Sequence, residues 1–122
     1  MKKSAAIKKI LVCDDDPDIL ELVALMLRSN GYYTVCELNS PDIYKKIDEE
    51  NPDAIVLDLW MPILSGEKII KVLKRDQKTK HIPIIVISAS NDGKEIAERA
   101  GADDFIGKPF DIDTLLRVVN KN

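Results

Sequence analysis

Residues 54–62 read Ala-Ile-Val-Leu-Asp-Leu-Trp-Met-Pro, and the position of Asp58 within them is the most informative feature of the chain. Four apolar residues precede Asp58, so its carboxylate stands where a buried strand is expected to stop. Residues 10–17 repeat the pattern, because Ile-Leu-Val-Cys is followed by Asp-Asp-Asp-Pro. If these two strands are neighbours in a sheet, the acids that follow them lie close together.

Two more apolar runs also end in polar residues, since Ser88 follows residues 84–87 and Lys108 follows residues 104–107. Apolar residues at helical spacing alternate with these runs and predict five helices. The expected helices run from Pro17, after an Asp16 N-cap, to a stop at Asn30 and Gly31, then over about 41–50 after a Ser40 cap, 66–75, 93–100 and the segment after Asp111.

The strand candidates are continuous apolar runs, a pattern typical of strands that helices cover on both faces. Five alternations of strand and helix predict an α/β fold, a doubly wound (βα)5 unit around a parallel five-stranded sheet. The order 2-1-3-4-5 suits five strands, and ligands then bind beside the carboxyl ends of the first and third strands. Asp14, Asp15 and Asp58 lie at that position.

Length and charge exclude several classes of function. The 122 residues carry a net charge of −3, and we expect a single domain, with a core over about 8–119 and no output domain within the chain. The acidic balance offers no basic surface for nucleic acid or for an anionic membrane. No apolar stretch is long enough to span a membrane, and residues 1–4 do not begin a signal peptide. We therefore expect a soluble, cytoplasmic protein.

The acids call for a positive partner, because each close pair of carboxylates repels by about 4 kcal/mol at the effective dielectric of a protein surface. Mg²⁺ suits such a site, since it prefers hard oxygen ligands and binds through one or two carboxylates. A structural role accounts for only one acid, because Asp16 with Pro17 fits the N-cap of the first helix. Asp14, Asp15 and Asp58 remain as candidates for a metal site.

The cation and the hydroxyl at the other strand ends suggest the substrate. Lys108 would bind an anion beside the metal, and Ser88 would donate a hydrogen bond to it, which points to a phosphoryl group. Asp58 stands alone at its strand end and is the better nucleophile for an acyl phosphate. Asp14 and Asp15 form a pair suited to share the metal.

In this order and spacing the motifs resemble the receiver domains of two-component response regulators, over nearly the whole chain. The matching segments are residues 10–17 with the first acids, the phosphoacceptor loop 58–62 with Gly66, residues 87–89, and Lys-Pro-Phe at 108–110. The resemblance implies a flavodoxin-like fold and a signalling phosphoacceptor rather than an enzyme. Asp58 would accept its phosphoryl group from a phosphohistidine on a sensor histidine kinase or a histidine phosphotransfer protein.

The resemblance also assigns the ligands of the metal. Asp15, Asp58 and the backbone carbonyl of Trp60 would bind Mg²⁺ directly, and Asp14 would act through water. We further expect the Trp60 side chain to shield the acyl phosphate from water, because it lies two positions after the acceptor.

A switch is implied as well. Lys108 would pair with the phosphate, and Ser88 would follow the phosphoryl oxygen. That movement would let the ring of Phe105 turn inward and would reshape the surface of the helix 93–100, the strand 104–107 and the last helix, where downstream proteins bind. Phenylalanine stands where tyrosine is frequent in the family, so the ring has no hydroxyl to offer a partner.

Two alternatives remain open. A phosphohydrolase of the haloacid dehalogenase type would use Asp14 and Asp16 as its Asp-x-Asp pair, but its second acidic pair would follow the lysine, whereas Asp103 and Asp104 precede Lys108. That alternative also leaves Asp58 without a role. A degenerate receiver that serves only as a binding module would not need the complete set of acids, hydroxyl and lysine.

Overall fold

The elements of the fold alternate as the sequence predicts. The computed structural model describes residues 8–122, so the start of the chain, where no signal peptide was expected, lies outside the described residues. The elements in chain order are β1 (Lys9–Cys13), α1 (Pro17–Arg28), β2 (Tyr33–Glu37), the short 3₁₀ helix η1 (Ser40–Asp42), α2 (Ile43–Glu50), β3 (Ala54–Asp58), α3 (Gly66–Arg75), β4 (Ile84–Ser88), α4 (Gly93–Ala100), β5 (Asp104–Gly107) and α5 (Ile112–Lys121).

The five strands form one parallel sheet in the order β2-β1-β3-β4-β5, which confirms the predicted topology. Cys13 of β1 pairs with Leu57 of β3, and Asp58 pairs with Ile87 of β4. The carboxyl ends of β1, β3 and β4 therefore lie at one edge of the sheet. Asp14, Asp58 and Ser88 meet there, although many residues of sequence separate them.

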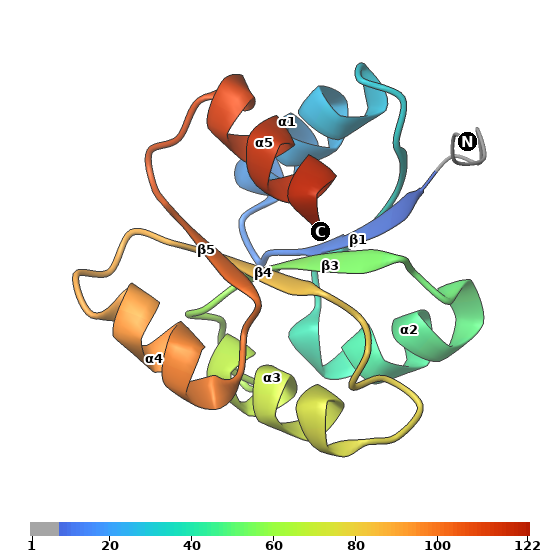
Figure 1. The fold of residues 1–122 in the computed structure, drawn as a ribbon, viewed down its shortest axis with the longest axis vertical. Coiled ribbons are helices and arrows are strands. Elements are labelled where there is room, and N and C mark those ends of the chain that lie inside the picture. Colours follow the sequence, from blue (N-terminus) through green and yellow to red (C-terminus); the bar gives the residue numbers. More distant parts are fainter. Residues whose placement is uncertain (1–7) are drawn as a thin grey trace.

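Helices cover both faces of the sheet, with α1 and α5 on one side and α2, α3 and α4 on the other (Figure 1). Each strand contributes to both cores, because successive side chains point to opposite faces. Ile10 and Val12 belong to the core under α1 and α5, whereas Leu11 and Cys13 belong to the core over the other three helices. This two-sided burial explains why the strands appear in the sequence as unbroken apolar runs.

Local capping explains where several helices begin. The Asp16 carboxylate accepts a hydrogen bond from the Asp18 N–H at 2.9 Å, and Pro17 is the first residue of α1, as predicted. Ser65 and Asp111 cap α3 and α5 in the same way. The first helix ends at Arg28, and Gly31, with φ +92°, belongs to the turn that follows.

The predicted Ser40 cap is wrong. Residues 40–42 form a 3₁₀ turn, and α2 begins at Ile43 without a side-chain cap. Ser40 is buried, and its hydroxyl donates to the Pro62 carbonyl at 3.2 Å. A buried hydroxyl needs a partner, and the nearest acceptor belongs to the loop after β3, so a tertiary contact takes the place of the local cap.

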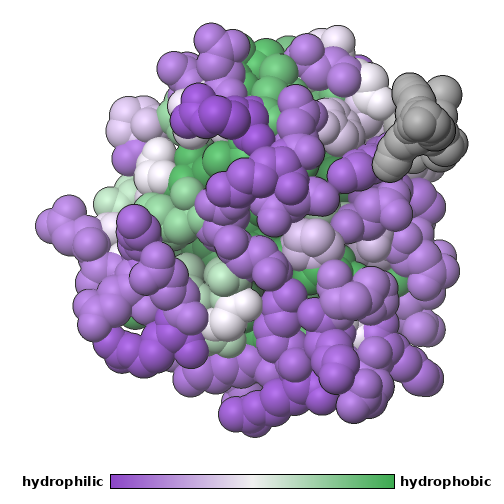
Figure 2. Space-filling model, in the orientation of Figure 1, coloured by the Kyte–Doolittle hydropathy of each residue, from purple (hydrophilic) through white to green (hydrophobic). Residues whose placement is uncertain are grey.

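The face of the molecule shown in Figure 2 is mostly polar. Hydrophilic side chains cover most of it, and hydrophobic surface shows around α5 and between α5 and α4 (Figure 2). Over residues 8–122, none of the helices has the length and apolar character that crossing a bilayer demands.

Candidate functional site

Three carboxylates gather at the carboxyl edge of the sheet. Asp14 and Asp15 follow β1, Asp58 ends β3, and one oxygen of each lies within 4.8 Å of those of the others. Asp14 and Asp58 are only 3% and 7% exposed, while Asp15 is open to solvent. The Asp14 Oδ1 accepts a hydrogen bond from the Asp16 N–H at 2.9 Å, which orients its carboxylate.

Lys108 brings a positive charge to the same place from the segment after β5. Its Nζ lies 3.4 Å from the Asp58 Oδ1 and 3.5 Å from the Asp14 Oδ2. The Lys108 N–H also donates to the Ser88 carbonyl at 2.9 Å, so the backbone of the lysine is tied to the end of β4. The predicted acids, lysine and hydroxyl residue are therefore brought together.

Burial changes the acidity of both enclosed carboxylates. Desolvation, and then the charge of Asp14, raise the pKa of Asp58 to about 6, although Lys108 opposes the shift. Burial also raises the pKa of Asp14, against hydrogen bonding from the Asp16 backbone and the charge of Lys108. A single lysine thus leaves the two carboxylates short of positive charge.

The donor set fits a hard divalent cation. Three carboxylate groups supply oxygen ligands alone, and the opening at Asp15 leaves room for the waters that Mg²⁺ keeps. Within the part of the chain that the structure describes, these three residues form the one cluster of potential metal ligands. Their surplus of negative charge is what such an ion would neutralise.

Ser88, Trp60 and Phe105 belong to β4, to the loop after β3 and to β5, and these three strands follow one another in the sheet. Ser88 is buried at the end of β4, and its Oγ accepts a hydrogen bond from the Ser90 N–H at 3.1 Å. Phe105 is half-buried on β5, and Trp60 is 53% exposed in the loop after β3. Phe105 pairs with Val86, two residues before Ser88, and its ring and the Ser88 hydroxyl both lie against the start of α4 at Gly93.

Sequence reasoning named Gly66 among the matching residues but did not foresee how closely it packs, and it missed the packing role of Gly93. An ideal Cβ on Gly66 would lie 2.4 Å from the Asp58 carbonyl oxygen, so α3 packs directly on the backbone of Asp58. An ideal Cβ on Gly93 would lie 3.0 Å from the Ser88 Oγ and 3.3 Å from the Phe105 Cε1. Both glycines stand at a helix start, where glycine is common for other reasons, so the sequence carried no separate signal of crowding.

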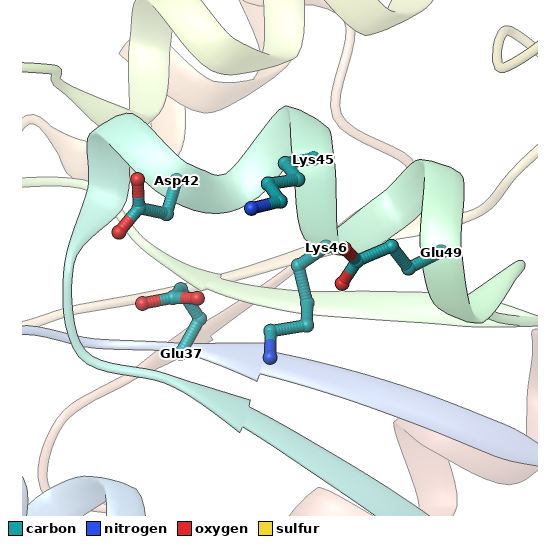
Figure 3. A pocket seen from close by; sticks show the side chains of 5 residues that line it. All are labelled: Glu37, Asp42, Lys45, Lys46 and Glu49. Carbon is teal, nitrogen blue, oxygen red and sulfur yellow. The ribbon is translucent and has the colours of Figure 1, made fainter.

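A second polar hollow, of about 190 Å³, lies between the end of β2 and α2. Figure 3 shows its charged side chains gathered there. Its lining residues carry three acids and two lysines, namely Glu37, Asp42, Lys45, Lys46 and Glu49. Because the opposite charges nearly balance, the hollow lacks both the surplus of acid that a metal requires and the surplus of base that a phosphate requires.

The hydrolase alternative finds no support in the geometry. Asp16 is exposed, and its carboxylate caps α1 instead of joining the acidic cluster. Asp58, which that alternative leaves without a role, is one of the three members of the cluster. The pairing of Asp14 with Asp16 as catalytic acids is therefore not what the fold assembles.

Comparisons with known proteins agree with this site. The family model of the response regulator receiver domain matches residues 10–120. Over 105 residues the chain is 39% identical to the phosphate regulon transcriptional regulatory protein PhoB of Pseudomonas aeruginosa, a match that covers 84% of this chain and 46% of PhoB. The chain thus spans about half the length of that relative. It is also 32% identical to protein PilH of P. aeruginosa, over 92% of this chain and 94% of PilH.

Solved structures point the same way. The receiver domain of the sensor histidine kinase PA1611 from P. aeruginosa PAO1, which has a magnesium ion coordinated in its active site cleft, superposes with a TM-score of 0.86. It is 27% identical, and the match covers 95% of this chain and 97% of that one. Since the family match spans nearly the whole chain and the fold and acidic cluster agree with it, the protein belongs to the response regulator receiver domains of two-component signalling.

Proposed function

We propose that Asp58 accepts a phosphoryl group from a phosphohistidine of a sensor histidine kinase or histidine phosphotransfer protein. One observation carries the proposal: a buried carboxylate at the end of β3 has the Lys108 ammonium 3.4 Å away and two more carboxylates beside it. In the transfer, an Asp58 carboxylate oxygen bonds to phosphorus. The P–N bond of the donor breaks, and its electron pair returns to the imidazole.

Asp15, Asp58 and the Trp60 backbone carbonyl are proposed to hold Mg²⁺, with Asp14 contributing through water. The bound ion would neutralise the negative charge that builds up when a phosphoryl group meets these acids. Lys108 contributes the remaining positive charge, because its ammonium already lies between Asp14 and Asp58. The residues of this chain therefore orient the incoming group and offset its charge.

The consequence is a signalling switch in place of substrate turnover. We infer that Ser88 donates to a phosphoryl oxygen and that Phe105 then changes position, so that the face formed by α4, β5 and α5 is altered. A downstream protein would read this face. The net charge of −3 argues against direct contact with nucleic acid. By this proposal the chain assists only its own phosphorylation and dephosphorylation, and it acts in the cytoplasm.

Intact-protein mass spectrometry after incubation with acetyl phosphate tests the proposal. We expect one added phosphoryl group, which requires Mg²⁺ and is absent from Asp58→Asn. Asp16→Asn is the matched control, because asparagine also caps a helix and Asp16 lies outside the cluster, so its adduct should equal that of the unaltered protein. Continuous phosphate release that Asp16→Asn abolishes would instead support the hydrolase. Absence of both reactions would leave a binding module.

The shielding role of Trp60 has its own test. Its side chain is half-exposed in the loop after β3, two residues from Asp58, where it can limit the approach of water to the acyl phosphate. We expect Trp60→Asn to lose the phosphoryl group faster than the unaltered protein, and Trp60→Phe, which keeps an aromatic ring, to lose it at an intermediate rate. The rate is the decay of the mass adduct after acetyl phosphate is removed. A Trp60→Asn adduct that decays no faster would contradict the shielding role.

A further inference from the structure

The start of α4 packs closely against Ser88 and Phe105 and leaves little room for a side chain at position 93. Gly93 is the first residue of α4 and is buried. An ideal Cβ there would lie 3.0 Å from the Ser88 Oγ, 3.1 Å from the Ser88 Cβ and 3.3 Å from the Phe105 Cε1. Gly93 does not have a positive φ, unlike Gly31 and Gly101. A larger residue at position 93 would therefore be disfavoured by the lack of space and not by the backbone conformation.

The connection from β4 to α4 ties Gly93 to the Ser88 hydroxyl. The Ser88 Oγ accepts from the Ser90 N–H at 3.1 Å, and the Ser90 carbonyl accepts from the Gly93 N–H at 3.2 Å. The Ser90 hydroxyl also bonds to the Asp92 carboxylate. A movement of Ser88 toward a phosphoryl group would thus act directly on the turn that leads into α4.

The ring of Phe105 has free space on another side. It lines a hollow of about 170 Å³ between α4 and β5, together with residues that include Lys94, Ala97 and Glu98. The ring already lies against Gly93, and this hollow offers it a second position, so an exchange between the two depends on the space at Gly93. Packed interiors tolerate an added methyl group poorly, so a side chain at 93 would resist that exchange.

We propose that Gly93 is a positioning residue of the switch: the missing side chain leaves the room that the Ser88 hydroxyl and the Phe105 ring need in order to move together. This inference rests on the proposed function, because phosphorylation of Asp58 starts the movement. A methyl group at position 93 should leave the acids and Lys108 in place, since the atoms nearest to it belong to Ser88 and Phe105.

Fluorine-labelled phenylalanine gives a direct test, because the chain contains only two phenylalanines, Phe105 and Phe110. We expect the Phe105 fluorine resonance to shift in proportion to the Asp58 adduct in the unaltered protein. In Gly93→Ala the adduct should form with Mg²⁺ as before, while the resonance stays at its unphosphorylated position. Gly107→Ala is the matched control, because its Cβ would lie 3.8 Å from the Phe105 Cε2, an ordinary contact, and its resonance should shift normally.

A second measurement keeps the test decisive if Gly93→Ala does not fold. The chain has five glycines, so a nitrogen-labelled glycine spectrum of the unaltered protein resolves each amide. The Gly93 signal should move with the adduct, and the Gly31 signal should not. An adduct with no movement of Gly93, or a normal Phe105 shift in folded Gly93→Ala, would overturn this inference alone. The absence of any adduct in the unaltered protein would overturn the proposed function and this inference with it.

Discussion

The protonation of Asp58 links the site to the stability of the protein. Its pKa is raised from 3.8 to about 6 by burial and by Asp14. The folded state therefore holds a proton that the unfolded chain releases, and stability is lost as the pH rises from about 4 to about 6. Asp58→Asn removes this penalty. In EDTA, we expect the variant to exceed the parent in free energy of unfolding by up to about 3 kcal/mol at about pH 7.5, since each pKa unit is about 1.4 kcal/mol.

Urea unfolding over that range of pH measures the difference. At about pH 4 the parent and Asp58→Asn should be nearly equal in stability, because Asp58 is then largely protonated in the folded state. Asp48→Asn serves as the control, since Asp48 is exposed on α2 and away from the cluster. If the difference in free energy of unfolding between Asp58→Asn and the parent does not change with pH, the pKa of Asp58 is not raised.

Ile63 holds an unfavourable backbone conformation beside the site. Its φ is +71°, and the Leu64 N–H donates to the Pro62 carbonyl at 2.8 Å, so a β-branched residue stands at the centre of a γ-turn. The side chain is 89% exposed, so its removal costs the folded protein almost no packing contacts. We expect Ile63→Gly to be more stable than the parent by about 1 kcal/mol, because glycine adopts this φ without strain.

Thermal or urea unfolding of the parent, Ile63→Gly and Ile63→Ala shows whether backbone strain or the exposed side chain lowers the stability. Ile63→Ala removes the same exposed apolar surface but keeps a Cβ, so it should gain little and remain less stable than Ile63→Gly. If the alanine variant is as stable as the glycine variant, exposure of the side chain and not strain at Ile63 is responsible.

At the scale of an element, the start of α3 packs against the backbone of Asp58 and Leu59. A Cβ on Gly66 would approach the Asp58 carbonyl oxygen to 2.4 Å and the Leu59 Cα to 2.8 Å, and these are backbone atoms that cannot turn aside. We expect Gly66→Ala to lower the free energy of unfolding by about 1–3 kcal/mol, the usual cost of overpacking. The variant should also form the acetyl phosphate adduct more slowly, because Asp58 must shift with its backbone.

The control for Gly66→Ala is again Gly107→Ala, whose added methyl group meets no atom closer than 3.8 Å. Its stability should stay within about 0.5 kcal/mol of the parent. Urea unfolding compares the two variants under identical conditions. If Gly66→Ala and the parent are equally stable, α3 can move away from β3 without a loss of folding free energy.

At the scale of the whole molecule, Mg²⁺ should raise stability, because a cation that binds only the folded state shifts the unfolding equilibrium. With free Mg²⁺ at about 100 times its dissociation constant, the expected gain is about 2.7 kcal/mol. Asp15→Asn should abolish most of the gain while leaving the metal-free stability almost unchanged, since Asp15 is exposed. Thermal unfolding with Mg²⁺ and with EDTA measures both quantities. An equal gain in the parent and in Asp15→Asn would exclude Asp15 as a ligand.

Much of the fold and of the site follows from local patterns. The Asp16 and Pro17 start of α1, the runs that become β1, β3 and β4, and the acids that follow them were all predicted correctly, because each depends on residues close in sequence. The prediction failed at Ser40, whose hydroxyl bonds to the Pro62 carbonyl, 22 positions away. A local pattern cannot anticipate such a partner.

The sequence by itself determined which segments become strands and helices, the two-sided burial of the strands and the chemical groups that follow them. The reason is that hydrophobic period and capping act over a few residues. Only the tertiary structure decided that Lys108 lies 3.4 Å from Asp58, that burial raises the pKa of Asp58 to about 6, and that Gly93 packs against both Ser88 and Phe105. Distance, desolvation and crowding depend on atoms from segments that meet only when the chain is folded.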